Sequence, residues 1–275
     1  MAVALVLIAL VVGSVAFHLL SPWWWTPIAS NWQYIDQAMI ITFWITGLVF
    51  IAVVLFMAYC VFRFRHKEGS KADFQPESKR LEILLATGTA LGVAAMLAPG
   101  LVVWSHFISP PPGATVVEVV GQQWQWSFRL PGKQGRLGLS DTRFVTSDNL
   151  LGLNPYDPNN KDNVLVVGGD LHLPVGKPVK ILLRSIDVIH DFYVPEFRAK
   201  MDLMPGIVTY FWFTPTRTGR FEILCAGFCG VGHPSMRGNV VVETDEAYQA
   251  WLQSQPIFAG IRKAEAETPR RAVAR

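Results

Sequence analysis

The sequence predicts a membrane-anchored all-β protein, in which two or three N-terminal transmembrane helices precede a β-sandwich. Two observations lead to this prediction. Charged residues make up only 16% of the chain, against a usual ~25%, and the deficit falls in the first 108 residues, which are largely apolar. From Pro110 onwards, short β-rich runs alternate with turn residues, a pattern typical of sandwiches and barrels.

The N-terminal segment, residues 1–35, begins with the apolar stretch Met1–Leu20, which contains no acid, lysine or arginine. Two interpretations stay open for this stretch: a retained third helix and a cleaved signal peptide. A signal peptide usually has a basic start and an A-x-A-like cleavage site, and neither is evident, so the retained helix is favoured. The rest of the segment is a linker outside the membrane.

Residues 36–109 are predicted to form a transmembrane helical hairpin, with apolar stretches at about 38–62 and 83–108. Each exceeds the ~20 residues that cross a bilayer as a helix. The basic residues between the two stretches are Arg63, Arg65, Lys67, Lys71, Lys79 and Arg80, whereas residues 21–35 contain no lysine or arginine. The positive-inside rule therefore places this loop in the cytoplasm and everything after Ile108 in the periplasm of a bacterium, on the far side of its inner membrane. The tryptophans expected in an aromatic belt on that outer side are Trp23, Trp24, Trp25 and Trp32.

Residues 110–258 form the predicted outer β domain. The expected strands are Val116–Val120, Trp124–Leu130, Asn163–Val167, Val179–Leu183, Ile207–Phe213, Arg220–Leu224 and Asn239–Glu243. A long loop rich in Asp, Asn, Gly and Pro is expected over Leu137–Asp162, and a short closing helix over Glu243–Gln253. Residues 259–275 mix charged residues and alanine without a core pattern, which predicts a mobile tail.

The segment Cys225–Met236 carries the residues that predict chemistry. It contains two thiols, one imidazole and one thioether, Cys225, Cys229, His233 and Met236, and His190 lies upstream. Sulfur and imidazole ligands with a weak axial methionine are typical of copper in electron transfer. A mononuclear site needs one cysteine, so the second cysteine favours two thiolates that bridge two copper ions. A disulfide and a Cys₂His₂ zinc site are the alternatives that these residue types allow.

At these residues the chain resembles cytochrome c oxidase subunit II, whose pattern is an upstream His followed by Cys-x-Glu-x-Cys-x-x-x-His-x-x-Met. The resemblance implies a cupredoxin-like Greek-key β-sandwich that holds a binuclear copper centre, CuA. It also implies a role for each matching residue. The implied ligands are the bridging Cys225 and Cys229, the terminal His190 and His233, the weak axial Met236, and the backbone carbonyl of Gly227.

A second segment, Gly121–Ser127, looks like the aromatic segment of this family, whose first tryptophan receives electrons from cytochrome c. Trp124 takes that position. On its own, a Trp-x-Trp pattern on a strand indicates core packing, and only the neighbouring copper motif favours the functional interpretation. Asp187 lies close in sequence to His190, which suggests that it orients that ligand; a solvated loop acid is the alternative.

The sequence departs from the family at Gly227, where the family usually has glutamate. Copper needs only the backbone carbonyl of this residue. The glutamate side chain, however, helps to bind a magnesium ion at the boundary with subunit I, so Gly227 removes that ligand. Glu82 matches a family glutamate near a proton path into subunit I, but its neighbours differ from the family's, and an ordinary helix-end carboxylate is the other interpretation.

The resemblance implies an oxidoreductase subunit that passes electrons from reduced cytochrome c through CuA to heme in catalytic subunit I, where oxygen is reduced. A CuA subunit of a heme–copper nitric oxide reductase is the alternative, because the glutamate is lost and an N-terminal segment is added. A structural subunit that has lost CuA is disfavoured because all five side-chain ligands are present. The formal charge is +3 and the basic residues form no stripe, so nucleic acid is not an expected partner.

Overall fold

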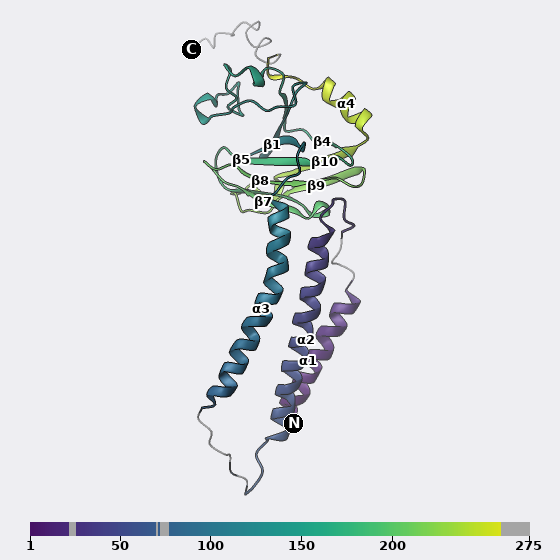
Figure 1. The fold of residues 1–275 in the computed structure, drawn as a ribbon, viewed down its shortest axis with the longest axis vertical. Coiled ribbons are helices and arrows are strands. Elements are labelled where there is room, and N and C mark those ends of the chain that lie inside the picture. Colours follow the sequence, from purple (N-terminus) through teal and green to yellow (C-terminus); the bar gives the residue numbers. More distant parts are fainter. Residues whose placement is uncertain (22–25, 70, 72–76, 260–275) are drawn as a thin grey trace. The chain divides into compact units, whose positions relative to one another are not determined.

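The computed structural model describes residues 1–21, 26–69, 71 and 77–259. The chain divides into two compact units: Met1–Thr26 with Tyr34–Trp104, and Pro27–Gln33 with Ser105–Arg275. The first unit is helical and the second is built mainly of strands (Figure 1). Three of the expected belt tryptophans, at positions 23–25, and residues 260–275 of the expected tail lie outside the described residues.

The helical unit is formed by α1 (Ala2–Leu20), α2 (Gln33–Arg63) and α3 (Lys79–Phe107). Each helix is long and apolar enough to cross a membrane, and most of their large apolar side chains are exposed in the chain itself. In water such exposure would be costly, whereas in a bilayer these side chains face lipid. The prediction of N-terminal membrane-spanning helices is confirmed, and all three helices suit membrane anchoring. Glu82 lies in the first turn of α3.

The β unit contains two five-stranded sheets. The first has the order β3-β2-β1-β5-β8, with β1 at Thr115–Gln122, β2 at Gln125–Leu130, β3 at Val164–Val167, β5 at Val179–Ser185 and β8 at Thr209–Phe213. The second has the order β4-β10-β9-β6-β7, with β4 at Leu171–Pro174, β6 at His190–Val194, β7 at Ala199–Leu203, β9 at Gly219–Cys225 and β10 at Arg237–Glu243. The short helix α4 (Asp245–Ser254) follows β10, as expected. The predicted sandwich is thus confirmed.

The core lies between the two sheets, where alternate residues of each strand point inward. β5 shows this alternation along its whole length, with Ile181 and Leu183 fully buried. Aromatic rings connect the sheets: Phe192 of β6 packs against Phe211 of β8 at 6.2 Å and edge-on against Trp126 of β2 at 5.8 Å between ring centroids. This packing anchors β6, the strand that begins with His190.

Three strands are not expected from the sequence: β4, β6 and β7. Each is only four or five residues long, and polar residues occur within all of them, so none forms an apolar run. β7 alternates buried Ala199 and Leu203 with the charged Lys200 and Asp202, and pairs antiparallel with β6. Strand pairing, rather than intrinsic preference, determines these elements.

Residues 27–33 belong to the β unit and run along its edge. The backbone N–H of Ala29 donates to Glu196 O at 2.7 Å, and Ser30 Oγ donates to Phe197 O at 2.7 Å. Trp32, expected in an aromatic belt, is instead 3% exposed, and its Nε1 donates to Trp212 O at 2.8 Å. The ring of Trp32 contacts Phe107 at 5.2 Å between centroids. The linker is therefore part of the folded domain.

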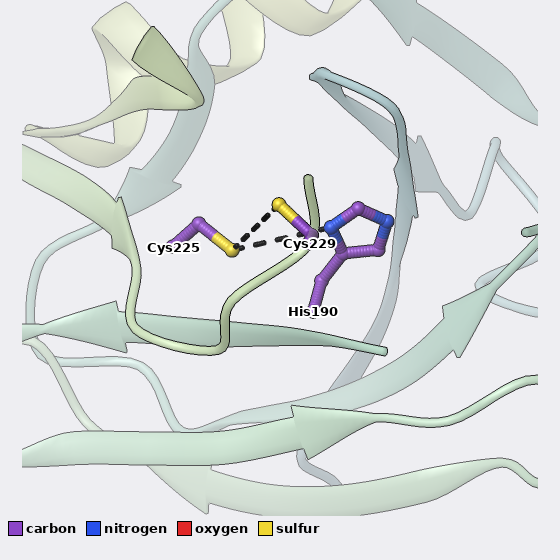
Figure 2. A group of neighbouring side chains, drawn as sticks. All are labelled: His190, Cys225 and Cys229. Carbon is purple, nitrogen blue, oxygen red and sulfur yellow. Dashed lines mark hydrogen bonds between the residues drawn. The ribbon is translucent and has the colours of Figure 1, made fainter. Parts of the chain in front are cut away.

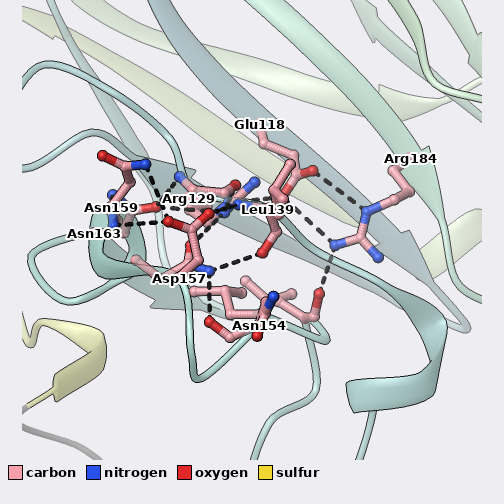
Figure 3. Close-up of polar contacts among 12 residues, drawn as sticks. Glu118, Arg129, Leu139, Asn154, Asp157, Asn159, Asn163 and Arg184 are labelled. Carbon is pink, nitrogen blue, oxygen red and sulfur yellow. Dashed lines mark hydrogen bonds and ion pairs between the residues drawn. The ribbon is translucent and has the colours of Figure 1, made fainter.

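The long loop between β2 and β3 contains only two short 3₁₀ turns, Thr142–Phe144 and Pro158–Asn160, in keeping with the irregular segment expected there. The buried side chain of Arg129 on β2 holds the loop to the first sheet. An ion pair with Glu118 of β1 fixes this side chain: Arg129 Nε lies 2.9 Å from Glu118 Oε2, and both side chains are under 5% exposed (Figure 3). The same guanidinium donates to Gly138 O at 2.8 Å and Asn160 Oδ1 at 3.0 Å. Arg184 pairs with Glu118 at 3.3 Å from the other side. Burial lowers the pKa of Arg129 and the neighbouring Glu118 opposes this shift.

Candidate metal centre

The connection between β9 and β10 forms the candidate metal centre. β9 ends at Cys225 and β10 begins at Arg237, so Cys225–Met236 is the loop that joins two antiparallel neighbours. β6 lies beside β9 on its other side, in a register that pairs Phe192 with Cys225. His190, the first residue of β6, is therefore brought next to the loop although it lies 35 positions upstream.

The two cysteines and His190 point toward one another (Figure 2). The sulfurs of Cys225 and Cys229 are 3.7 Å apart, and His190 Nδ1 lies 3.9 Å from Cys225 Sγ. Both thiols are free, and a disulfide needs a much shorter S–S distance of ~2.05 Å. One ligand atom from each of the three residues lies within 4.8 Å of the others, a spacing that one or two metal ions can bridge.

The remaining residues expected at the site lie on the same loop and reach the same thiols. His233 Nδ1 is 3.5 Å from Cys229 Sγ, and Met236 Sδ is 3.9 Å from it. The carbonyl oxygen of Gly227 lies 3.2 Å from Cys225 Sγ. His233 belongs to a 3₁₀ turn, His233–Ser235, that directs its ring back toward the cysteines. Two thiols, two imidazole nitrogens, a thioether and a carbonyl thus face one space.

The donor set and its burial fit copper. His190, Cys229 and Met236 are each at most 3% exposed, so water hardly reaches the site. Burial and, after it, the neighbouring Cys225 raise the pKa of Cys229 to about 11. Two adjacent thiolates in such a place therefore require positive charge, which a metal ion supplies. Two soft sulfurs, two imidazoles and a weak thioether match the ligands that copper takes in electron transfer.

Asp187 connects His190 to the neighbouring β1–β2 turn. Its Oδ1 lies 2.8 Å from His190 Nε2 and accepts from Val188 N at 2.7 Å, while its Oδ2 accepts from Gln123 N at 2.6 Å. Burial opposes ionisation of Asp187, but these bonds to His190, Gln123 and Val188 outweigh it and lower its pKa. A carboxylate on Nε2 leaves Nδ1 free to face the thiols, in agreement with the sequence-based hypothesis.

Trp124 lies directly on the metal-binding loop. Its Nε1 donates to Cys229 O at 3.1 Å, and the Nε2 of Gln123 donates to the same carbonyl at 2.9 Å. A Cβ added to Gly232 would come within 2.3 Å of Trp124 Cδ2, so only glycine at 232 lets the ring pack against the loop. The tryptophan remains 38% exposed. The contributions of Gln123 and Gly232 are not expected from the sequence, because glutamine and glycine carry no chemical signal by themselves.

An ion pair lies beside the candidate metal centre. Asp191, next to His190, is 2% exposed, and its Oδ2 pairs with Lys200 Nζ at 2.8 Å. Burial raises the pKa of Asp191; the Lys200 ammonium opposes this shift and the carboxyl group of Asp202 adds to it. A Cβ built on Gly227 would lie 3.3 Å from Asp191 Cβ.

Comparisons with known proteins identify relatives of this chain. Residues 115–244 match the family described as cytochrome C oxidase subunit II, periplasmic domain. The chain is 64% identical over 261 residues to the alternative cytochrome c oxidase subunit 2 of Bradyrhizobium diazoefficiens, covering 95% of this chain and 94% of that protein. It is 27% identical over 239 residues to cytochrome c oxidase subunit 2 of Cereibacter sphaeroides, covering 83% and 77% of the two chains.

Among solved structures, the periplasmic domain of subunit II of a cytochrome oxidase from Bradyrhizobium japonicum is 27% identical, with a TM-score of 0.40, and the match covers 53% of this chain and 95% of that one. The identity to the Bradyrhizobium diazoefficiens protein extends over both the helices and the β domain. The chain therefore belongs to the cytochrome c oxidase subunit II family, a family of membrane-anchored oxidoreductase subunits with a periplasmic β domain.

Proposed function

We propose that this chain is the electron-accepting subunit of a cytochrome c oxidase, which passes electrons from reduced cytochrome c through a binuclear CuA centre to heme in catalytic subunit I. The observation that carries the proposal is the convergence of two free thiols with two imidazole nitrogens and a thioether, each within 3.5–3.9 Å of a cysteine sulfur. Reduction of oxygen belongs to the partner subunit.

Four residues of the loop and one of β6 carry the side chains that would hold the two copper ions. These are the thiols of Cys225 and Cys229, the imidazoles of His190 and His233, and the thioether of Met236. The carbonyl of Gly227 completes the set. When bound, CuA supplies a centre that takes up and releases one electron at a time. The strands β6 and β9 keep the ligands in place, because both are paired on either side within the sheet.

Trp124 is the residue that receives the electron. Its exposed ring is available to a protein donor, and its Nε1 is bonded to the carbonyl of Cys229. A single hydrogen bond therefore connects the surface with a residue that holds copper. Two exposed apolar side chains, Phe228 at 83% and Val231 at 91%, lie on the same loop and suit contact with partner proteins.

The second candidate is a CuA subunit of a heme–copper nitric oxide reductase. The observation that favours it is Gly227, which offers a carbonyl to copper but lacks the carboxylate that oxidases of this family use for magnesium. Both candidates share every copper ligand. The terminal acceptor is set by the catalytic subunit, so it must be measured on the whole complex.

The experiment is turnover of the purified complex with reduced cytochrome c, with oxygen and nitric oxide offered in parallel. Fast oxygen consumption with little use of nitric oxide is the expected result. Preferential reduction of nitric oxide would overturn the oxidase assignment and leave the copper assignment intact.

Cys229→Ser tests the metal centre itself. A serine oxygen is a poor bridging ligand for copper, so the variant should lose the binuclear centre and its visible absorption. Cys60→Ser is the matched control, since Cys60 lies on α2, away from the loop in sequence and fold unit. A Cys229→Ser complex that retains two copper ions and normal turnover would refute the ligand assignment.

A further inference from the structure

The two-residue turn between β1 and β2 contacts the candidate metal centre through both of its side chains. The ladder between these strands ends at the pair Gln122 and Gln125, so Gln123 and Trp124 form the turn. Nε2 of Gln123 donates to the carbonyl oxygen of Cys229 at 2.9 Å, and Nε1 of Trp124 donates to the same oxygen at 3.1 Å. The proposed function uses the tryptophan and leaves the glutamine without a role.

Gln123 also contacts the other half of the site, through its backbone. Its N–H group donates to Oδ2 of Asp187 at 2.6 Å, and Oδ1 of Asp187 lies 2.8 Å from Nε2 of His190. Gln123 is thus bonded both to the carboxylate that contacts His190 and to the carbonyl of Cys229. Asp187 and Cys229 lie 64 and 106 positions away from Gln123 in the chain, and this one residue joins them.

The metal-binding loop needs an external hold at Cys229 because glycines follow it. Gly230 has a φ of +114°, a conformation that L side chains rarely adopt. A Cβ on Gly232 would lie 2.3 Å from Trp124 Cδ2, so the ring packs directly on the backbone of the loop. Glycine leaves the backbone free to rotate. The sequence that lets Trp124 approach the loop therefore also leaves the Cys229–Gly230 peptide mobile unless hydrogen bonds hold it.

The two turn side chains hold that peptide by its oxygen. A carbonyl oxygen has two lone pairs, and the donors of Gln123 and Trp124 can occupy both. The amide of Gln123 lies close to the loop, since a Cβ on Gly230 would come within 3.2 Å of its Nε2. Cys229 is 3% exposed, and its sulfur lies 3.7 Å from that of Cys225. A fixed carbonyl therefore restricts where this buried thiol can lie.

We propose that Gln123 is a positioning residue of the metal centre, which keeps the His190 side of the site and the Cys229 loop at a fixed separation. The proposal rests on the proposed function, because it concerns residues that would hold copper. The backbone of Gln123 acts on His190 through Asp187, and its side chain acts on Cys229 through the carbonyl. A site that is preorganised in this way binds its metal more tightly, because less freedom is lost on binding.

Gln123→Leu tests the side-chain bond. Leucine has no donor and leaves the backbone bond to Asp187 in place. Gln123 is exposed, so the substitution opens no cavity in the core. The first measurement is copper release from the purified complex to a competing chelator, followed by the visible absorption of the centre. Loss of one hydrogen bond should weaken copper retention by about fivefold.

Gln125→Leu is the matched control. It changes the same residue type two positions further along, but its amide lies toward β3 and away from the loop: a Cβ on Gly168 would lie 2.9 Å from Gln125 Nε2. The control should release copper as the unmodified complex does. Equal copper release in Gln123→Leu and in Gln125→Leu would overturn the proposal.

Amide hydrogen exchange of the copper-depleted, reduced complex measures the positioning without the metal. The N–H group of Gly230 belongs to the peptide whose oxygen Gln123 holds. It should exchange about fivefold faster in Gln123→Leu than in Gln125→Leu, because the peptide loses one of its two bonds. Equal exchange at Gly230 in the two variants would show that the amide of Gln123 does not hold the loop.

Electron uptake separates Gln123 from Trp124. The bond from Trp124 to the loop remains in Gln123→Leu, so the copper-loaded fraction should accept electrons from reduced cytochrome c at the rate of the unmodified complex. Slower uptake with unchanged copper retention would place Gln123 on the electron path and overturn the positioning role. Cys229→Ser addresses the proposed function separately. Loss of copper in Cys229→Ser beside normal behaviour of Gln123→Leu would refute only the role of Gln123.

Discussion

Asp187→Asn is the substitution that most directly tests how this fold positions its metal ligand. The carboxylate of Asp187 accepts from the backbone N–H groups of Gln123 and Val188 and contacts Nε2 of His190, all within 2.8 Å. Asparagine has nearly the same shape, but one of its two terminal groups is an amide NH₂. At least one of the three N–H donors would then face another donor.

The expected loss follows from these contacts. A hydrogen bond to a charged group contributes about 1.5–3 kcal/mol, and about 1.4 kcal/mol corresponds to a factor of ten in an equilibrium constant. Copper should therefore bind roughly 10–100-fold more weakly. Partners of metal-bound histidines show losses in the same range when they are substituted. Loss of a negative charge near the centre should also raise its reduction potential.

The assay is copper release to a competing chelator, followed by the visible absorption of the centre, together with a redox titration of the same complex. Asp170→Asn is the matched control, because Asp170 is 27% exposed and pairs with Arg220, while Asp187 is 29% exposed. The control should leave both quantities unchanged. Equal copper affinity and equal potential in Asp187→Asn and the control would refute the positioning role.

Three further predictions concern the surface tryptophan and the long loop. Trp124→Phe removes the hydrogen bond to Cys229 O and should slow electron uptake from cytochrome c while copper is retained. Unchanged rates of electron uptake in stopped-flow measurements would show that Trp124 is not on the electron-transfer path. Arg129→Met leaves buried acceptors unpaired. It should lower the free energy needed to open the loop by about 3 kcal/mol, as measured by amide hydrogen exchange. Arg143→Met is its control, because that side chain is 80% exposed, and equal exchange in both variants would contradict the role of the buried pair. Bonds from the backbone N–H groups of Leu139 and Asn159 lower the pKa of Asp157. The ionised carboxylate therefore stabilises the folded loop above the unfolded pKa of ~3.9. This stabilisation is lost as the pH falls through the lower pKa of the folded state. Asp157→Asn should therefore flatten the acid dependence of loop protection between about pH 5 and 2, and an unchanged profile would rule this out.

The outer domain could be predicted from its sequence where strands are apolar and alternate. Val179–Ser185 buries every second side chain and Thr209–Phe213 buries Phe211 and Phe213, and the sequence predicts both strands. Strands β6 and β7 could not be predicted in this way, because polar side chains interrupt both of them. Their extended conformation is stabilised by the antiparallel pairing of one with the other. The membrane helices were predictable because the bilayer requires long apolar runs.

The site was predictable only in part. The loop residues from Cys225 to Met236 are close in sequence, and their types alone indicate copper chemistry. The approach of His190 to within 3.9 Å of Cys225 Sγ depends on the pairing of β6 with β9, which spacing alone does not give. The pairing of Glu118 with Arg129 and Arg184 joins three different strands, and neither periodicity nor composition points to it.

The attachment of residues 27–33 to the β domain has a consequence for biogenesis. The outer domain is discontinuous in the chain, because it includes a segment that precedes α2 and α3 in the sequence. Folding of the domain must therefore wait until two separate stretches have reached the same side of the membrane. A soluble fragment that starts at Pro110 would lack both Trp32 and Phe107, and would leave the ring of Trp212 and the stacked face of Phe211 uncovered. An isolated outer domain should therefore include both stretches, for example with residues 27–33 joined to residue 105 through a flexible linker.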